Sequence, residues 1–179
     1  MKLLTVAIPC YNSSEYMDKS IRSAISGGDR VEVVVVDDGS SDNTLEIANK
    51  YQKKFPDIVK VVHQENGGHG EAVNTGIKNA TGLYFKVLDS DDCLGKNALQ
   101  KVLDLLEDMV SKDAGLDMLI SNFMYDKQGA KHKKIMKYKS AMPVGRMFGW
   151  DELHFGTSQY LLMHSVIYRT KVLRECKMQ

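Results

Sequence analysis

Apolar and polar positions along the first 125 residues fall into blocks that switch between two periods. Residues 3–9 and 31–37 are nearly continuous apolar runs, which is typical of strands buried on both faces. Between them, residues 17–25 carry apolar side chains at the spacing of an amphipathic helix, and Gly27 follows where that pattern stops. The start of the chain therefore predicts a strand, a helix and a second strand.

The alternation of strand and helix patterns continues to residue 124. Strands that alternate with helices predict an α/β fold with a mostly parallel central sheet flanked by helices. Beyond residue 124 the pattern weakens. Helices are expected over residues 45–55, 71–80, 97–110 and 170–176, strands over 58–63, 83–88, 118–123 and 161–168, a lysine-rich hairpin over 125–138 and a loop over 143–150.

Parallel α/β sheets bind ligands outside the carboxyl ends of their strands. The segments that follow the predicted strands at this edge are rich in polar residues and glycine, and they cover residues 10–14, 37–42, 64–70 and 89–93. We therefore expect one ligand site at this edge of the sheet. The side chains of residues 12–14 are also expected to cap the first helix.

The composition excludes several classes of partner. With 179 residues, 43% hydrophobic and 26% charged, the chain suits a single globular domain. A net charge of +1 gives no electrostatic reason to expect a nucleic acid partner. Three widely spaced cysteines without a CxxC pair argue against a disulfide framework, and no apolar run approaches the ~20 residues of a membrane span. We therefore expect a cytoplasmic protein.

The charges are not evenly distributed along the chain. Six lysines and no acid lie between Lys127 and Lys139. Such a run is most often a solvated face. The alternative is peripheral contact with the inner face of a membrane, or with a polyanionic acceptor.

Three aspartates, Asp89, Asp91 and Asp92, follow the predicted strand over residues 83–88. Three carboxylates in four residues repel one another unless a cation or hydrogen-bond donors neutralise them. Oxygen-only ligands suit Mg²⁺ or Mn²⁺, and such an ion stabilises a diphosphate as a leaving group. The alternative is a solvated loop in which Asp92 helps to cap a helix.

The other polar segments offer contacts for a nucleotide. Asp38 is placed to accept a hydrogen bond from a nucleobase, although a helix cap at residues 40–42 explains part of the same segment. Tyr11 is placed to stack on a base, a contact worth about 1–3 kcal/mol. Its alternative role is packing over the sheet edge.

Glycines around Gly68 allow the backbone to approach a ligand closely. His69, in the same loop, suits a phosphate or sugar contact, with a solvent-exposed side chain as the slightly favoured alternative. His164 lies inside an apolar run and is interpreted as a core histidine.

The four segments, in this order, resemble family 2 of the inverting glycosyltransferases, which have the GT-A (Rossmann-like) fold. The resemblance covers residues 3–95 and continues weakly through 164–170. The matching stretches are Ile8-Pro9-Cys10-Tyr11-Asn12, Val35-Val36-Asp37-Asp38-Gly39-Ser40-Ser41-Asp42, Asn66-Gly67-Gly68 with Ala72 and Asn74-Thr75-Gly76, and Leu88-Asp89-Ser90-Asp91-Asp92.

The resemblance implies transfer of a sugar from a nucleoside diphosphate, usually UDP, to a carbohydrate or lipid-linked acceptor hydroxyl, with inversion at the anomeric carbon. It assigns Pro9 and Tyr11 to the nucleobase slot and Asp38 to the base. It also implies Mn²⁺ or Mg²⁺ on Asp91 and Asp92. The implied donor-binding set is Pro9, Tyr11, Asp38, Gly68, His69, Asn74, Asp89 and Asp91.

Three departures from the family pattern qualify this assignment. Val73 stands where many relatives carry arginine, and Cys93 stands where many carry an aromatic residue. The carboxylate base that deprotonates the acceptor lies in this family beyond the position of Gln179. We therefore expect one GT-A domain, truncated at its C-terminus, with residues 1–95 as the nucleotide-sugar-binding half and 96–179 as part of the acceptor-side half.

Other enzyme classes fit less well. A dinucleotide-binding dehydrogenase would need a GxGxxG turn after the first strand, and this chain has none. A metal-dependent nucleotidyltransferase shares the sheet and the carboxylates but usually has a basic, glycine-rich loop after the first strand. A non-catalytic nucleotide-sugar-binding module is the alternative outside the enzymes.

Overall fold

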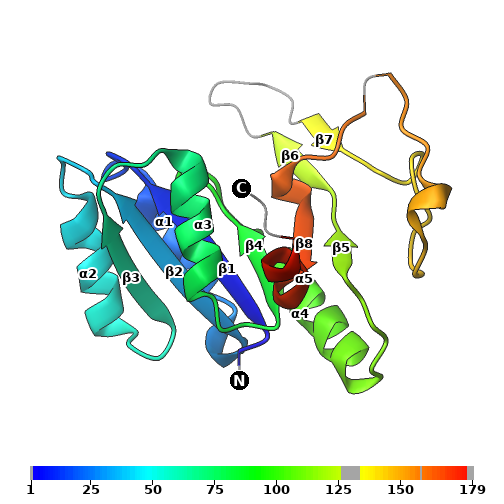
Figure 1. The fold of residues 1–179 in the computed structure, drawn as a ribbon, viewed down its shortest axis with the longest axis horizontal. Helices are drawn as coiled ribbons and strands as arrows, with labels where there is room; N and C mark the ends of the chain where they lie inside the picture. The colour runs from blue at the N-terminus through cyan, green and yellow to red at the C-terminus, as the bar shows by residue number, and fades with distance from the viewer. Residues whose placement is uncertain (1, 126–133, 158, 177–179) are drawn as a thin grey trace. The chain divides into compact units, whose positions relative to one another are not determined.

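The computed structural model describes residues 2–125, 134–157 and 159–176 (Figure 1). The chain divides into two compact units. Unit 1 is Met1–Asp117 with Tyr168–Gln179, and unit 2 is Met118–Ile167.

Unit 1 is built on a parallel sheet with β1 (Leu4–Cys10) in the interior. Parallel strands β2 (Val31–Asp38) and β4 (Tyr84–Val87) flank β1, and β3 (Val59–Gln64) lies next to β2. The end of β8 pairs antiparallel with β4, through Tyr168 and Arg169, so the order in unit 1 is β3-β2-β1-β4-β8. All residues of β1 and β2 are buried, which confirms the strands expected from continuous apolar runs.

Helices cover this sheet, as the alternating pattern predicts. They are α1 (Met17–Ile25), α2 (Thr44–Lys54), α3 (His69–Asn79), α4 (Lys96–Ser111) and α5 (Thr170–Glu175), with a 3-10 turn η1 (Gly28–Arg30) after α1. Figure 1 shows α3 and α5 in front of the sheet and α1 behind it. Phe85 and Leu173 belong to the apolar cluster under α3 and α5. In α3, Gly76 permits close packing, because a Cβ there would lie 2.7 Å from the Cβ of Ala7.

Unit 2 has shorter elements. Its strand β5 (Met118–Ile120) neighbours the first half of β8 (Val166–Arg169), and β6 (Phe123–Tyr125) pairs antiparallel with β7 (Lys134–Met136). This pairing confirms the expected hairpin, whose residues 126–133 lie outside the described part. The 3-10 turns are η2 (Trp150–Glu152) and η3 (Met163–Ser165).

Three elements differ clearly from the sequence-based expectation. The strand expected over 118–123 is divided, because β5 ends at Ile120 and β6, which belongs to a separate two-stranded sheet, begins at Phe123. The strand expected over 161–168 is confined to Val166–Arg169, because Ser165 closes a 3-10 turn onto the carbonyl of Leu162 through both its N–H (3.0 Å) and its hydroxyl (2.6 Å). Helix α3 begins at His69 rather than at Glu71, since Gly68, with φ of +85°, turns the chain into the helix. No helix in the described residues combines the length and apolar character needed to cross a membrane.

Candidate functional site

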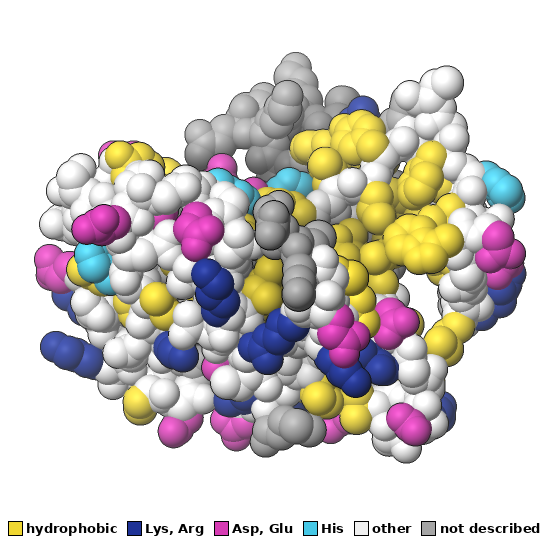
Figure 2. Space-filling model, viewed as in Figure 1, with side chains coloured by type: hydrophobic (Ala, Val, Ile, Leu, Met, Phe, Trp, Pro, Cys, Tyr) yellow, Lys and Arg dark blue, Asp and Glu magenta, His cyan; other side chains and the backbone are white. Residues whose placement is uncertain are grey.

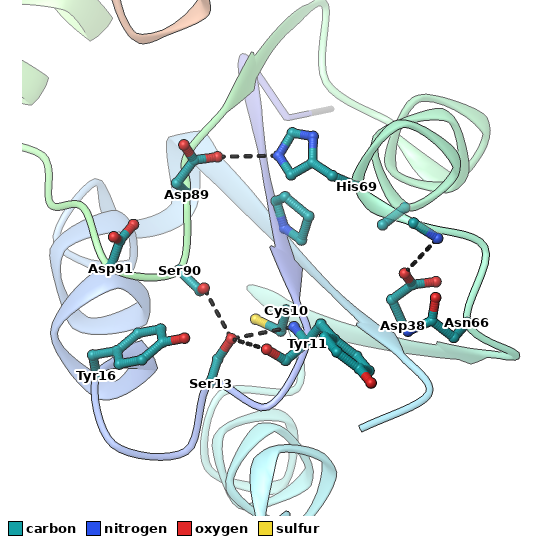
Figure 3. Close-up of a pocket in the computed structure, with 13 residues that line it drawn as sticks. Cys10, Tyr11, Ser13, Tyr16, Asp38, Asn66, His69, Asp89, Ser90 and Asp91 are labelled. Carbon is teal, nitrogen blue, oxygen red and sulfur yellow. Dashed lines mark hydrogen bonds and ion pairs between the residues drawn. The ribbon is translucent and has the colours of Figure 1, made fainter. Parts of the chain in front are cut away.

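The carboxyl ends of β1, β2 and β4 and the loop after β3 converge on a pocket of about 420 Å³ (Figure 3). All four polar segments identified in the sequence contribute to it. Its lining consists of Pro9, Cys10, Tyr11, Ser13, Tyr16, Asp38, Asn66, Gly68, His69, Ala72, Asp89, Ser90 and Asp91. The pocket lies wholly within unit 1.

Most of the predicted site residues line this pocket. They are Pro9, Tyr11, Asp38, Gly68, His69, Asp89 and Asp91. Asn74 and Asp92 are not among the lining residues. The amide of Asn74 lies 3.4 Å from a carboxylate oxygen of Glu71 on the same helix, and Asp92 is exposed, with its N–H donating to the carbonyl of Asp89 at 3.0 Å.

Several lining residues were not predicted from the sequence. These polar residues are Ser13, Tyr16, Asn66 and Ser90. A signal existed for Tyr16, since it is an aromatic residue just before the amphipathic helix, but nothing local shows that its ring faces the same pocket as the aspartates. Tyr16 lies beside Asp91 in Figure 3.

The loop after β1 is tied to its neighbours instead of capping α1. The N–H of the buried Ser13 donates to the hydroxyl of Thr44 at 2.7 Å, and the hydroxyls of Ser13 and Ser90 lie 2.9 Å apart. Asn12, at φ of +49°, accepts a hydrogen bond from the N–H of Ser41 at 2.9 Å. No side-chain hydrogen bond caps α1, so that expectation was wrong. These residues form hydrogen bonds with neighbouring loops instead.

Tyr11 lines the pocket, and 54% of its surface is exposed. Because the backbone around it is held by these contacts, the ring presents a face to a ligand without being packed into the core. An exposed aromatic ring on an anchored loop suits stacking against a planar base.

Asp38 holds the glycine-rich loop. Its carboxylate accepts the N–H groups of Gly67 and Gly68, both at 2.9 Å, and the side-chain amide of Gln64 at 2.7 Å. The side chain is buried. A carboxylate offers about four acceptor positions, so about one remains for a ligand donor. Asp38 therefore shapes the pocket whether or not it also contacts a ligand.

Asp37, its neighbour, faces elsewhere. Its carboxylate is fully buried and lies 2.7 Å from Nδ1 of His63. Asp37 also pairs in register with Cys10 of β1. Burial, with a further contribution from Asp37, raises the pKa of the Cys10 thiol to about 12, so this thiol stays protonated near neutral pH.

The segment after β4 carries the aspartates and is anchored to α1. The carbonyl of Asp89 accepts from the hydroxyl of Ser20 at 3.2 Å, and the N–H of Leu94 donates to the hydroxyl of Ser23 at 3.0 Å. A carboxylate oxygen of Asp89 lies 3.2 Å from Nε2 of His69. Carboxylate oxygens of Asp89 and Asp92 approach within 4.8 Å of one another. This oxygen-rich loop fits a hard divalent cation.

Lys86 lies beneath this loop on β4 and is only 6% exposed. Burial lowers the pKa of its ammonium to about 8, and the charges of Asp92 and Asp89 oppose that shift. Sequence reasoning missed this residue. The signal was present, since a lysine interrupts an otherwise apolar strand before the aspartates.

The remaining candidates lie in unit 2. Lys134, Lys137 and Lys139 are exposed, whereas Lys127, Lys131 and Lys133 lie outside the described residues. His164 is half-buried, and its ring lies 5.8 Å from that of Phe123.

Comparison with known proteins adds a family to this geometry. Residues 5–170 match the family model of glycosyl transferase family 2. An uncharacterized glycosyltransferase of Rickettsia felis is 34% identical over 149 residues, which cover 81% of this chain and 23% of the relative.

Solved structures of TarS from S. aureus show the same fold. The TarS 1–349 structure matches 99% of this chain with a TM-score of 0.74 and 28% identity, and its complex with UDP-GlcNAc matches with a TM-score of 0.70 and 27% identity. This chain covers 50% and 48% of those two structures. The central sheet with helices on both faces is therefore a GT-A fold, and the chain spans 23% of the Rickettsia felis relative and 50% of the TarS 1–349 structure.

Proposed function

This chain belongs to glycosyl transferase family 2, and we propose that its pocket binds the nucleotide-sugar donor, a UDP-sugar, for inverting transfer to an acceptor hydroxyl. The observation that carries the proposal is the convergence of an exposed aromatic ring and a group of aspartates on one pocket at the carboxyl edge of the sheet. The TarS structure that matches this chain holds UDP-GlcNAc, which supports a uridine nucleotide.

The nucleoside is proposed to lie between Tyr11 and Asp38. Tyr11 offers a stacking face, and Asp38 retains about one acceptor position for the base imide. Gly68 lines the same end of the pocket, where the lack of a side chain leaves room for a ligand. The uracil specificity would then come from one charged acceptor in a buried position.

The diphosphate is proposed to lie towards Asp89, Asp91 and His69. A diphosphate cannot approach carboxylates without a cation between them, so a Mn²⁺ or Mg²⁺ ion held by Asp91 and Asp92 is part of the proposal. The closeness of the Asp89 and Asp92 oxygens supports a cation in this loop. When bound, such an ion stabilises the charge on the departing nucleoside diphosphate.

The protein's own groups orient the donor. The loops that carry Tyr11, Asp38 and Asp89 are linked by hydrogen bonds among Ser13, Ser90 and Thr44, so the ligand meets a preformed surface. Inversion follows when the acceptor hydroxyl attacks the anomeric carbon from the face opposite the leaving group, while a carboxylate base takes its proton. The acceptor is proposed to be a carbohydrate or a lipid-linked sugar.

Calorimetric titration of UDP, with and without Mn²⁺, tests the donor site. We expect binding that depends on Mn²⁺ and that Asp91→Ala weakens at least about tenfold, because loss of a charged ligand costs more than about 1.4 kcal/mol. Asp57→Ala is the matched control, since Asp57 is exposed and lies outside the pocket. Absence of UDP binding in both conditions, with GDP or CDP bound instead, would contradict the uridine assignment.

A further inference from the structure

Lys86 is a basic residue that lies buried in the central sheet. Among the residues that the structure describes, it is the only lysine or arginine in the buried class. It occupies β4, an interior strand, where it pairs in register with Val6 of β1. Burying an ammonium group is costly unless nearby charges or hydrogen bonds compensate. A lysine at such a position therefore calls for a compensating partner.

The alternation of side chains along β4 places Lys86 on the side of the sheet where the aspartate loop is anchored. Phe85 and Val87 face the apolar cluster under α3 and α5, so Lys86 faces the opposite side, which α1 covers. Ser20 and Ser23 of α1 hold the loop on that same side.

The compensating charges are those of Asp92 and Asp89, both of which act on the Lys86 ammonium. Their own carboxylate oxygens approach within 4.8 Å, and two anions at that distance repel each other. His69 also faces Asp89, at 3.2 Å, but its side chain is 55% exposed, so water screens this contact. Lys86 is buried and is screened far less.

We propose that Lys86 is a positioning residue whose ammonium is the built-in counter-ion of the Asp89 and Asp92 pair, holding the aspartate loop in its binding shape before any divalent cation arrives. Asp91, which lines the pocket, then holds the cation together with Asp92, whose carboxylate has acceptor positions beyond those that face Lys86. The consequence for donor binding rests on the proposed function, whereas the charge coupling itself does not.

A double-mutant cycle in metal-free buffer with EDTA measures that coupling. Lys86→Met keeps an unbranched apolar side chain of nearly the same length and removes the charge. This substitution is made in the wild type, in Asp92→Asn and in Asp91→Asn. The cost of burying Lys86 is the same in every background. Any difference between backgrounds in the Tm change caused by Lys86→Met therefore reports the charge coupling alone. We expect the Tm change caused by Lys86→Met to be less unfavourable by roughly 3 °C in the Asp92→Asn background than in the wild type.

Asp91→Asn is the matched control, because it removes one charge from the same loop and Asp91 is not among the charges that act on Lys86. In that background we expect the Tm change to resemble the wild-type value. Equal Tm changes in all three backgrounds would overturn the proposal and leave Lys86 as a packing residue. If Lys86→Met does not fold, the same cycle is run with Lys86→Gln.

UDP binding supplies a readout that a packing role would not move. In Lys86→Met, the ratio of the UDP Kd without Mn²⁺ to the Kd at saturating Mn²⁺ should rise about fivefold, since only the added ion then neutralises the loop. Lys86→Arg should keep the wild-type ratio. Parallel weakening in both conditions would contradict the positioning role. If the wild type binds no UDP at all, the proposed function fails, and the metal-free cycle still decides the role of Lys86.

Discussion

The two compact units bury apolar surface to different extents. In unit 1, strands β1 and β2 are buried along their whole length. The described strands β5, β6 and β7 of unit 2 have three residues each, and many large hydrophobic side chains there are exposed (Figure 2). The exposed set is Met124, Ile135, Val144, Met147, Trp150, Phe155 and Tyr160.

The candidate pocket is formed entirely by unit 1, whose central strands are fully buried. A site that must hold an aromatic ring and several carboxylates in fixed positions needs rigid elements beneath its loops. The residues that line the pocket all belong to unit 1, whereas the described part of unit 2 leaves apolar surface of the kind that commonly marks contact with a partner or a ligand. The difference separates a part suited to precise binding from a part with spare contact surface.

The largest expected effect compares one isoleucine from each unit. Ile8 is fully buried in β1, and Ile135 in β7 is 51% exposed. Ile8→Ala should lower the free energy of unfolding by about 3 kcal/mol, because it leaves a cavity in a packed core. Ile135→Ala should cost less than about 0.5 kcal/mol. Urea unfolding measures both, and similar losses would show that unit 2 buries Ile135 in solution.

The next effect probes how the pocket depends on its loop contacts. Asp38→Asn replaces one acceptor oxygen by an amide N–H₂, which then faces the N–H donor of either Gly67 or Gly68, because these two donate to different oxygens of Asp38. Stability should fall by about 2 kcal/mol, and UDP should bind at least about tenfold more weakly. Asp57→Asn is the control. Thermal unfolding and calorimetry give the two values, and an unchanged Asp38→Asn protein would show that Asp38 does not hold the loop.

A smaller difference is expected between two glycines with positive φ, one from each unit. Gly39 has φ of +72°, and a Cβ there would meet the backbone nitrogen of Asn66 at 2.9 Å. Gly145 has φ of +75° with open space around it. Alanine at Gly145 should cost about 1 kcal/mol from backbone strain alone, and alanine at Gly39 about 2 kcal/mol or more. Equal losses in chemical denaturation would mean that the Asn66 loop moves freely.

The smallest effect needs no mutation. Cys10 is buried with a pKa raised to about 12, whereas Cys93 and Cys176 are exposed. A thiol reagent at neutral pH should therefore modify two thiols quickly and the third only on unfolding, since the thiolate is the reactive form. Mass spectrometry of the labelled peptides identifies the slow site. Rapid labelling of Cys10 would show that the sheet of unit 1 opens.

Much of unit 1 could be predicted from local pattern. The continuous apolar runs at Leu4–Cys10 and Val31–Asp38 indicate strands buried on both faces, and the structure confirms them. The pattern was less informative in unit 2, where Leu161–Ser165 reads as strand but a turn closed by Ser165 intervenes. Short elements with few buried residues carry too little periodicity to distinguish strand from turn.

The sequence by itself also determined where the site would lie, because parallel strands bring their carboxyl ends to one edge wherever the chain forms such a sheet. Only the tertiary structure decided which side chains face the pocket. Asp89 and Asp91 line it and Asp92 does not, since the turn closed by Asp92 onto Asp89 points successive side chains in different directions. On α3, Ala72 faces the pocket and Asn74 lies about 200° further round the helix. Lys86 shows the same limit: its charge is plain in the sequence, but its burial beside Asp89 and Asp92 depends on how the strand, the helix and the loop pack together.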